Sequence, residues 1–132
     1  MDKILKSMTL KFFAVGGHKI SPEKLLETEK SLFLDVRSNE EAAAISIKLQ
    51  HHPRIVSKQI PVDELPDRLD EIPKDMFIGI FCPANVRSTM AYIYLLSKGF
   101  TQVRIVEGGY AALTEALKPG KIWKQIQAQK NV

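Results

Sequence analysis

The chain contains a single cysteine, Cys82, and the residues around it have the types and spacing of a reactive loop. Cys82 follows an apolar run of strand length, Met76–Phe81, and Arg87 and Ser88 then open an apolar segment with helical spacing. A strand, a short turn and a helix would place the thiol in front of N–H groups that lack partners inside the helix. Because a helix N-terminus and a nearby arginine favour the nucleophilic thiolate, we expect sulfur or anion chemistry here.

The loop after Cys82 has the composition of an anion-binding nest. If its N–H groups curl inward, the positive end of the helix dipole lies behind them. We expect Arg87 to line the rim or fix the loop, and Ser88 to cap the helix or donate to a bound anion. Tight nests often need a residue with positive φ, which asparagine tolerates, and Asn85 suits that role. Most lone cysteines are core residues, but the position of Cys82 favours a functional thiol.

Two acidic residues also follow predicted strands. Asp35 lies where catalytic groups can lie, but we favour a structural role in which it braces a loop or pairs with Arg37. We expect Glu107 to fix its turn. The adjacent histidines His51 and His52 would face opposite ways on a strand and could not chelate one ion together. We therefore expect no metal and no cofactor.

Length and composition favour one globular domain. The chain has 132 residues, of which 45% are hydrophobic and 26% charged, close to globular averages. The net charge of +4 is too diffuse to indicate nucleic acid. No apolar run approaches the ~20 residues of a membrane span, and the N-terminus lacks the pattern of a signal peptide. A single thiol suits a reducing compartment, so we expect a cytoplasmic location.

Apolar runs alternate with helical segments, which predicts a parallel sheet covered by helices, with ligands at the carboxyl ends of the strands. We divide the chain into an N-terminal segment (residues 1–19), a domain (20–117) and a basic C-terminal tail (118–132). We expect residues 1–8 to be frayed and the tail to be helical. The predicted strands are Thr9–Val15 (a short edge strand), Ser31–Val36, Ile55–Ile60, Met76–Phe81 and Val103–Val106. The predicted helices include Ser21–Glu29, Val62–Asp70, Arg87–Ser97 and Tyr110–Leu117, with a capping box of Ser38 and Glu41 before Ala42–Ala44.

The C-terminal tail is rich in lysine and contains no acidic residue. A solvated face is the usual explanation of such a run, and a docking patch for an acidic protein partner is the sharper one. We expect Trp123 to pack onto the domain. The lysines are Lys118, Lys121, Lys124 and Lys130.

Four segments together resemble the single-domain rhodanese family, and their order and spacing agree from about Ile20 to Leu117. They are Leu32–Arg37 (LFLDVR), Ile60–Leu65 (IPVDEL), Cys82–Ser88 (CPANVRS) and Val106–Tyr110 (VEGGY). The resemblance implies an α/β fold, with a five-stranded, mostly parallel sheet and helices on both faces.

The resemblance also implies a sulfurtransferase. Cys82 would take a sulfane sulfur from a small donor, become a persulfide, and pass the sulfur to a thiophilic acceptor such as cyanide or a thiol. No nucleic acid, membrane or cofactor is implied. The implied substrate-binding residues form the loop: Pro83, Ala84, Asn85, Val86, Arg87 and Ser88.

The loop departs from the family pattern and leaves alternatives open. The family usually has glycine where this chain has Asn85, and Pro83 and Ala84 offer no charge for thiosulfate, which leaves the donor unassigned. A non-catalytic binding or sulfur-relay module is one alternative. A phosphatase or arsenate reductase of the same fold is another, but such enzymes have one more residue between cysteine and arginine. The shorter spacer before Arg87 favours sulfur over a tetrahedral oxyanion.

Overall fold

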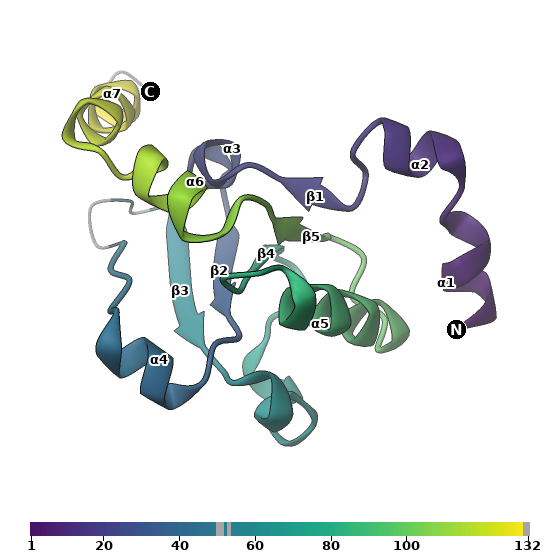
Figure 1. Ribbon diagram of the computed structural model, residues 1–132. Helices are drawn as coiled ribbons and strands as arrows, with labels where there is room; N and C mark the ends of the chain where they lie inside the picture. The colour runs from purple at the N-terminus through teal and green to yellow at the C-terminus, as the bar shows by residue number, and fades with distance from the viewer. Residues whose placement is uncertain (50–51, 53, 131–132) are drawn as a thin grey trace.

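The computed structural model describes residues 1–49, 52 and 54–130. Its centre is one five-stranded sheet in the order β1-β5-β4-β2-β3, and every strand pair in it is parallel (Figure 1). The α/β architecture expected from the alternating pattern is therefore confirmed. The strands are β1 (Lys19–Ile20), β2 (Ser31–Asp35), β3 (Ile55–Gln59), β4 (Phe77–Phe81) and β5 (Val103–Val106).

Helices cover both faces of the sheet. Figure 1 shows α5 (Val86–Ser97) on one side, and α3 (Pro22–Glu27) and α6 (Gly109–Ala116) on the other.

Within the described residues, no helix is long and apolar enough to cross a membrane. The remaining helices are α1 (Asp2–Ser7), α2 (Leu10–Ala14), α4 (Asn39–Ala44), α7 (Pro119–Lys130) and the 3-10 segments η1 (Val62–Asp67) and η2 (Leu69–Glu71).

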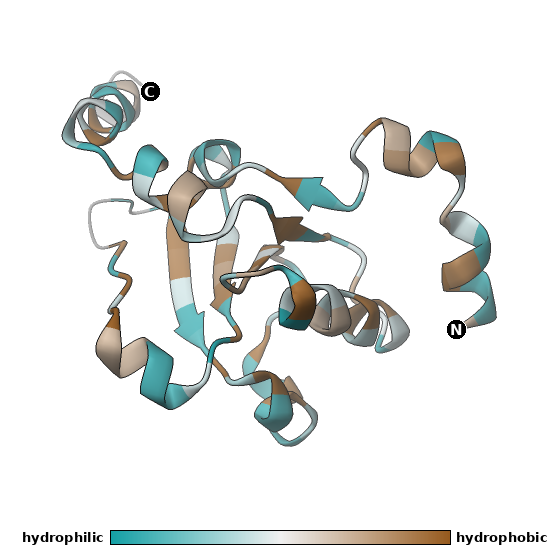
Figure 2. Ribbon diagram, viewed as in Figure 1, coloured by the Kyte–Doolittle hydropathy of each residue, from teal (hydrophilic) through white to brown (hydrophobic). Residues whose placement is uncertain are grey.

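Two hydrophobic cores lie on opposite faces of the sheet, because alternate residues of each strand point to opposite faces. Leu34 of β2 pairs with Ile80 of β4, which pairs with Ile105 of β5, and all three pack against α5. The alternate residues of the same strands, such as Phe33 and Phe81, pack against α3 and α6. Strands buried on both faces need apolar runs, as in Leu32–Leu34 of β2, which are all buried. β5 is largely brown in Figure 2, although Arg104 interrupts its apolar run.

Local signals set the helix starts as expected. The Ser21 side chain accepts a hydrogen bond from the Lys24 N–H, and proline occupies the first turn of α3. The capping box of Ser38 and Glu41 is present at α4. The expected helix over Val62–Asp70 forms as η1 and η2, with Pro66 inside η1.

The N-terminal prediction was wrong. Thr9–Val15 is not an edge strand, because Thr9 caps a helix: its side chain accepts from the Phe12 N–H at 3.2 Å. The edge position beside β5 is taken by β1 instead. Residues 1–8, which we expected to be frayed, contain α1. The helix before the tail, α6, ends at Ala116, and Pro119 then begins α7, where proline fits the first turn.

Candidate active site

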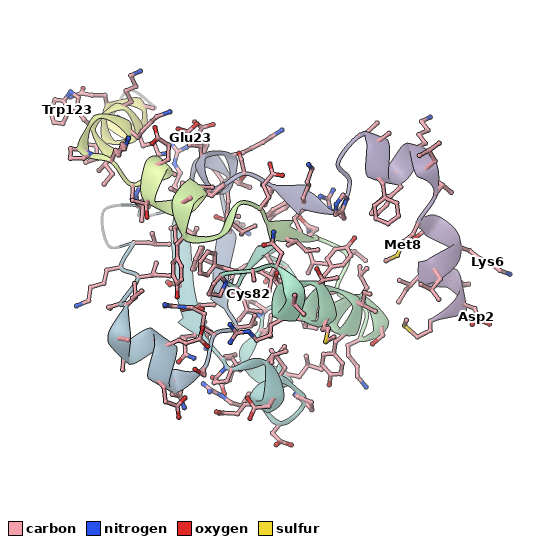
Figure 3. The ribbon with its side chains drawn as sticks, in the orientation of Figure 1. Asp2, Lys6, Met8, Glu23, Cys82 and Trp123 are labelled. Carbon is pink, nitrogen blue, oxygen red and sulfur yellow. The ribbon has the colours of Figure 1, made fainter. Side chains whose placement is uncertain are left out.

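The loop that carries Cys82 lies at the carboxyl edge of the sheet. Cys82 directly follows β4, whose neighbours are β2 and β5. The chain leaves β2 toward one edge of the sheet and leaves β4 toward the other, so the loop lies at the topological switch point where α/β proteins bind ligands. In Figure 3, Cys82 lies beside the start of α5.

The thiol of Cys82 is held by Ser88 in the first turn of α5. The Ser88 N–H donates to Cys82 Sγ at 3.2 Å, and the thiol donates to the Ser88 hydroxyl oxygen at 3.3 Å. Both side chains are buried, and Cys82 is only 1% exposed. Ser88 does not cap α5, whose N-cap is Asn85, and its other expected role, donation to a bound anion, stays a prediction.

Asn85 adopts the expected left-handed conformation, with φ 64° and ψ 1°. This bend ends the loop and starts α5 at Val86. The Asn85 backbone carbonyl accepts from the Thr89 hydroxyl at 2.6 Å. Pro83 has no N–H and so cannot be one of the nest donors, whereas Ala84 and Val86 remain predicted donors.

Arg87 ties the loop to a different element. Its guanidinium forms an ion pair with Glu41 of α4, with Nη2 donating to Oε2 at 3.0 Å. The hydrogen bonds from Arg87, and then those from Ser38, lower the pKa of Glu41 to about 2. The same pair raises the pKa of Arg87. Of the two expected roles of Arg87, fixing the loop is observed.

A second arginine braces the loop after β2. Arg37 is 1% exposed, and its Nη2 donates to Asp35 Oδ2 at 2.7 Å, which is the structural pairing favoured for Asp35. Its Nη1 donates to the Ile45 carbonyl at 2.7 Å and to the Tyr110 hydroxyl at 3.1 Å. The hydrogen bond to Asp35 is the main cause of its raised pKa. Arg37 thus connects β2, the end of α4 and α6.

Glu41 and Tyr110 were missed as site residues. The sequence indicates Glu41 only as half of a capping box, and Tyr110 only as the start of a helix and the end of the VEGGY segment. Their partners Arg87 and Arg37 lie 46 and 73 residues away, respectively. The sequence pattern carried no local signal for either contact.

The other predicted positions lie outside the loop. Glu107 forms an ion pair with Lys19 of β1 at 3.1 Å. No three His, Cys, Asp or Glu residues of the described chain are placed to hold a metal ion. His51 falls outside the described residues.

The tail lysines are partly neutralised by the domain. Lys121 pairs with Glu23 of α3, and Lys118 pairs with Glu115 at 2.7 Å. Trp123 is 59% exposed, so the prediction that it packs onto the domain was wrong (Figure 3). Pairing through Lys121 turns that face of α7 toward α3 and leaves the indole outside.

Comparisons with known proteins agree with this geometry. The model of the rhodanese-like domain family matches residues 22–116. A sulfurtransferase from Allochromatium vinosum is 33% identical over 90 residues, which cover 68% of this chain and 78% of that protein. The tRNA uridine(34) hydroxylase of Chlamydia abortus is 31% identical over 117 residues, but the chain spans only 34% of its length.

A solved structure extends the likeness to three dimensions. The rhodanese-like domain protein from Staphylococcus aureus is 34% identical, has a TM-score of 0.59, and is matched over 73% of this chain and 90% of its own. The fold, the strand–loop–helix placement of the cysteine and these relatives agree. The chain belongs to the rhodanese-like domain family, as a sulfurtransferase of the rhodanese type.

Proposed function

We propose that the chain moves a sulfane sulfur from a small donor to a thiophilic acceptor through a persulfide on Cys82. One observation carries this proposal: the Ser88 N–H, in the first turn of α5, donates to Cys82 Sγ. Unpaired N–H groups and the positive end of a helix dipole stabilise anions. A thiolate and the outer sulfur of a persulfide are both such anions.

The reaction has two displacement steps. In the first, the Cys82 thiolate attacks the sulfane sulfur of the donor, a sulfur–sulfur bond forms, and the rest of the donor leaves with the electron pair of the broken bond. In the second, the acceptor attacks the outer sulfur and Cys82 leaves again as a thiolate. No net oxidation of the protein occurs, and no cofactor is required for the electron balance.

An intact-mass experiment tests the proposal. After incubation with a sulfane donor, we expect the wild type to gain the mass of one sulfur atom and to lose it to cyanide. The Cys82→Ser variant should gain nothing. Absence of a cyanide-labile adduct on the wild type, or an adduct on Cys82→Ser, would sink the proposal.

A phosphatase or arsenate reductase is the less favoured enzyme. Only four residues separate Cys82 from Arg87, which makes a narrower cradle than a tetrahedral oxyanion needs. Hydrolysis of a generic aryl phosphate that is lost in Cys82→Ser would reverse this preference.

A non-catalytic binding or sulfur-relay module that serves one protein partner is a second candidate function, because Asn85 stands where the family usually has glycine and the C-terminal tail is rich in lysine. Its acidic partner would dock on the C-terminal tail, and a single reduced thiol would suit the cytoplasm. Normal turnover with small donors and acceptors, unchanged in Lys124→Glu, would count against it.

A further inference from the structure

A groove runs between α5 and the 3-10 segment η1, on the face of the sheet that α5 covers. Figure 1 shows this segment, in teal, next to α5. The groove has a volume of about 190 Å³, and its lining side chains are apolar apart from the hydroxyl group of Tyr94. That is smaller than the ~300 Å³ of the smallest usual small-molecule pockets, so the groove suits a single protein side chain. The lining residues are Val62, Leu65, Pro66, Met90, Ala91 and Tyr94.

An exposed apolar stripe joins this groove to the candidate active site. Met90 lines the groove and is 65% exposed, and Val86, one helical turn earlier, is 61% exposed. Val86 is the first residue of α5 and follows the Cys82 loop directly. One turn of an α-helix spans 5.4 Å, so a short segment of a partner could cover the groove and the loop together. Residues four apart lie on the same face of a helix, so Val86 and Met90 extend the apolar lining of the groove toward the loop.

The segment 62–71, which carries the Val62, Leu65 and Pro66 wall of the groove, is acidic beside that apolar lining, although the whole chain is basic. The segment 62–71 contains five acidic residues and one basic residue, Arg68. Arg68 pairs with Glu64 and Glu71 at 3.2 and 2.7 Å. Three acids of this segment have no ion pair with a described residue and are exposed: Asp63, Asp67 and Asp70.

We propose that this groove docks a protein acceptor whose cysteine is flanked by an apolar side chain and by lysines or arginines. The apolar side chain enters the groove at Met90, the basic residues face the acidic segment 62–71, and the cysteine meets the Cys82 loop. The role of the docked protein as a sulfur acceptor rests on the proposed persulfide chemistry, whereas the docking itself does not depend on that chemistry. It differs from docking on the lysine-rich tail, which would select an acidic partner.

The first test compares sulfur transfer to two synthetic peptides. One has a cysteine flanked by leucine and lysines, and the other has glutamates in place of the lysines. We expect persulfidated wild type to react roughly tenfold faster, in kcat/KM, with the lysine peptide, and this preference to shrink in ~1 M salt. Equal rates for the two peptides at low salt would overturn the proposal.

The second test compares a lysine introduced in the groove with a lysine introduced at an exposed apolar residue elsewhere. Met90→Lys should lower kcat/KM for the lysine peptide roughly tenfold, because it removes an apolar contact and repels the peptide. Its rate with 2-mercaptoethanol should stay at the wild-type value. Leu10→Lys makes the same kind of change at a residue of α2 that is 87% exposed, and should change neither rate. A loss with both acceptors in Met90→Lys would contradict docking.

A binding measurement keeps this test separate from the chemistry of Cys82. The chain has four methionines, and their methyl groups can be labelled and followed by NMR while a serine version of the lysine peptide is added. We expect the Met90 methyl signal to shift to saturation and those of Met1, Met8 and Met76 to stay. If Cys82 forms no persulfide but Met90 shifts, the proposed function fails and the docking surface stands; if Met90 does not shift, the docking proposal fails.

A second copy of this chain is the competing occupant, because its tail presents Trp123 among lysines. Analytical ultracentrifugation of the wild type and of Met90→Lys, which measures the oligomeric state, decides between a second copy and a separate acceptor protein. We expect both to be monomers. A wild-type dimer that Met90→Lys dissociates would assign the groove to self-association and overturn the proposal.

Discussion

Gly109, the first residue of α6, lies directly against the backbone of Pro83 in the Cys82 loop. A Cβ at position 109 would overlap the Pro83 carbonyl oxygen, and Gly109 also has φ 58°. Only glycine meets both requirements without strain. The glycine pair after β5 therefore sets how closely α6 can approach the active loop.

Gly109→Ala should accordingly disturb both stability and chemistry. We expect a loss of about 2 kcal/mol or more in the free energy of unfolding, because the conformation is strained and the contact atom is backbone. Persulfide formation should slow as the loop moves. Denaturant titration and the intact-mass assay measure the two effects. Gly120→Ala is the matched control, since nothing lies within 4 Å of its added Cβ, and its stability should be unchanged or slightly higher.

The sheet and the reactive loop could be predicted from the sequence because their signals are local. Mostly apolar runs identified β2, β4 and β5, and the order of residues from Cys82 to Ser88 identified a strand, a turn and a helix. The left-handed Asn85 followed from the conformations that asparagine tolerates. These features depend on a few neighbouring residues, so a single sequence reveals them.

The braces of the loop could not be predicted in the same way. Glu41 meets Arg87 and Tyr110 meets Arg37 only after the sheet has brought distant segments together. The N-terminal segment failed for a different reason. The apolar residues of Thr9–Val15 suit a strand or a short helix, and the Thr9 cap, together with the occupation of the sheet edge by β1, decided for the helix.

The buried pair of Arg37 and Asp35 gives a prediction on stability. Arg37→Met would leave the Asp35 carboxylate buried without its charged partner, so we expect a loss of about 3–5 kcal/mol in the free energy of unfolding. Adding Asp35→Asn should recover part of this loss, because no unpaired charge remains. Lys118→Met removes an ion pair whose side chains are 60% and 56% exposed, and should change stability by less than about 0.5 kcal/mol. An equal effect of Arg37→Met and Lys118→Met would contradict a bracing role.

Asn85 gives a prediction on the loop itself. Asn85→Gly should leave persulfide formation intact and stability equal or higher, because glycine suits φ 64° and removes a buried Oδ1 that has no hydrogen-bond partner among the described residues. Asn85→Ala should cost about 1 kcal/mol. Asn85→Val should cost more and slow sulfur loading. Thermal unfolding and timed intact-mass spectra measure both. Ala84→Ser, at an exposed neighbour, serves as the control and should behave as the wild type.

The ion pair of Glu41 and Arg87 predicts how the stability of the loop depends on pH. The pKa of Glu41 is about 2 in the folded chain and 4.5 for a free side chain. The pair's contribution is thus fully present above about pH 4.5 and is lost as the pH falls toward 2. Both side chains are about one-third exposed, so solvent screening limits the contribution to about 1 kcal/mol.

The Glu41→Gln variant isolates this contribution, because glutamine can still complete the capping box with Ser38. We expect the wild type to be more stable than the variant at pH 6, and the difference to shrink steadily between pH 4.5 and pH 3. Denaturant titrations of both proteins across this range measure it. Above pH 5 the variant should also load sulfur more slowly, because Arg87 no longer anchors the loop to α4. A stability difference that stays constant from pH 6 to pH 3 would show that the variant acts through packing, and the ionised pair would then not be what fixes the loop.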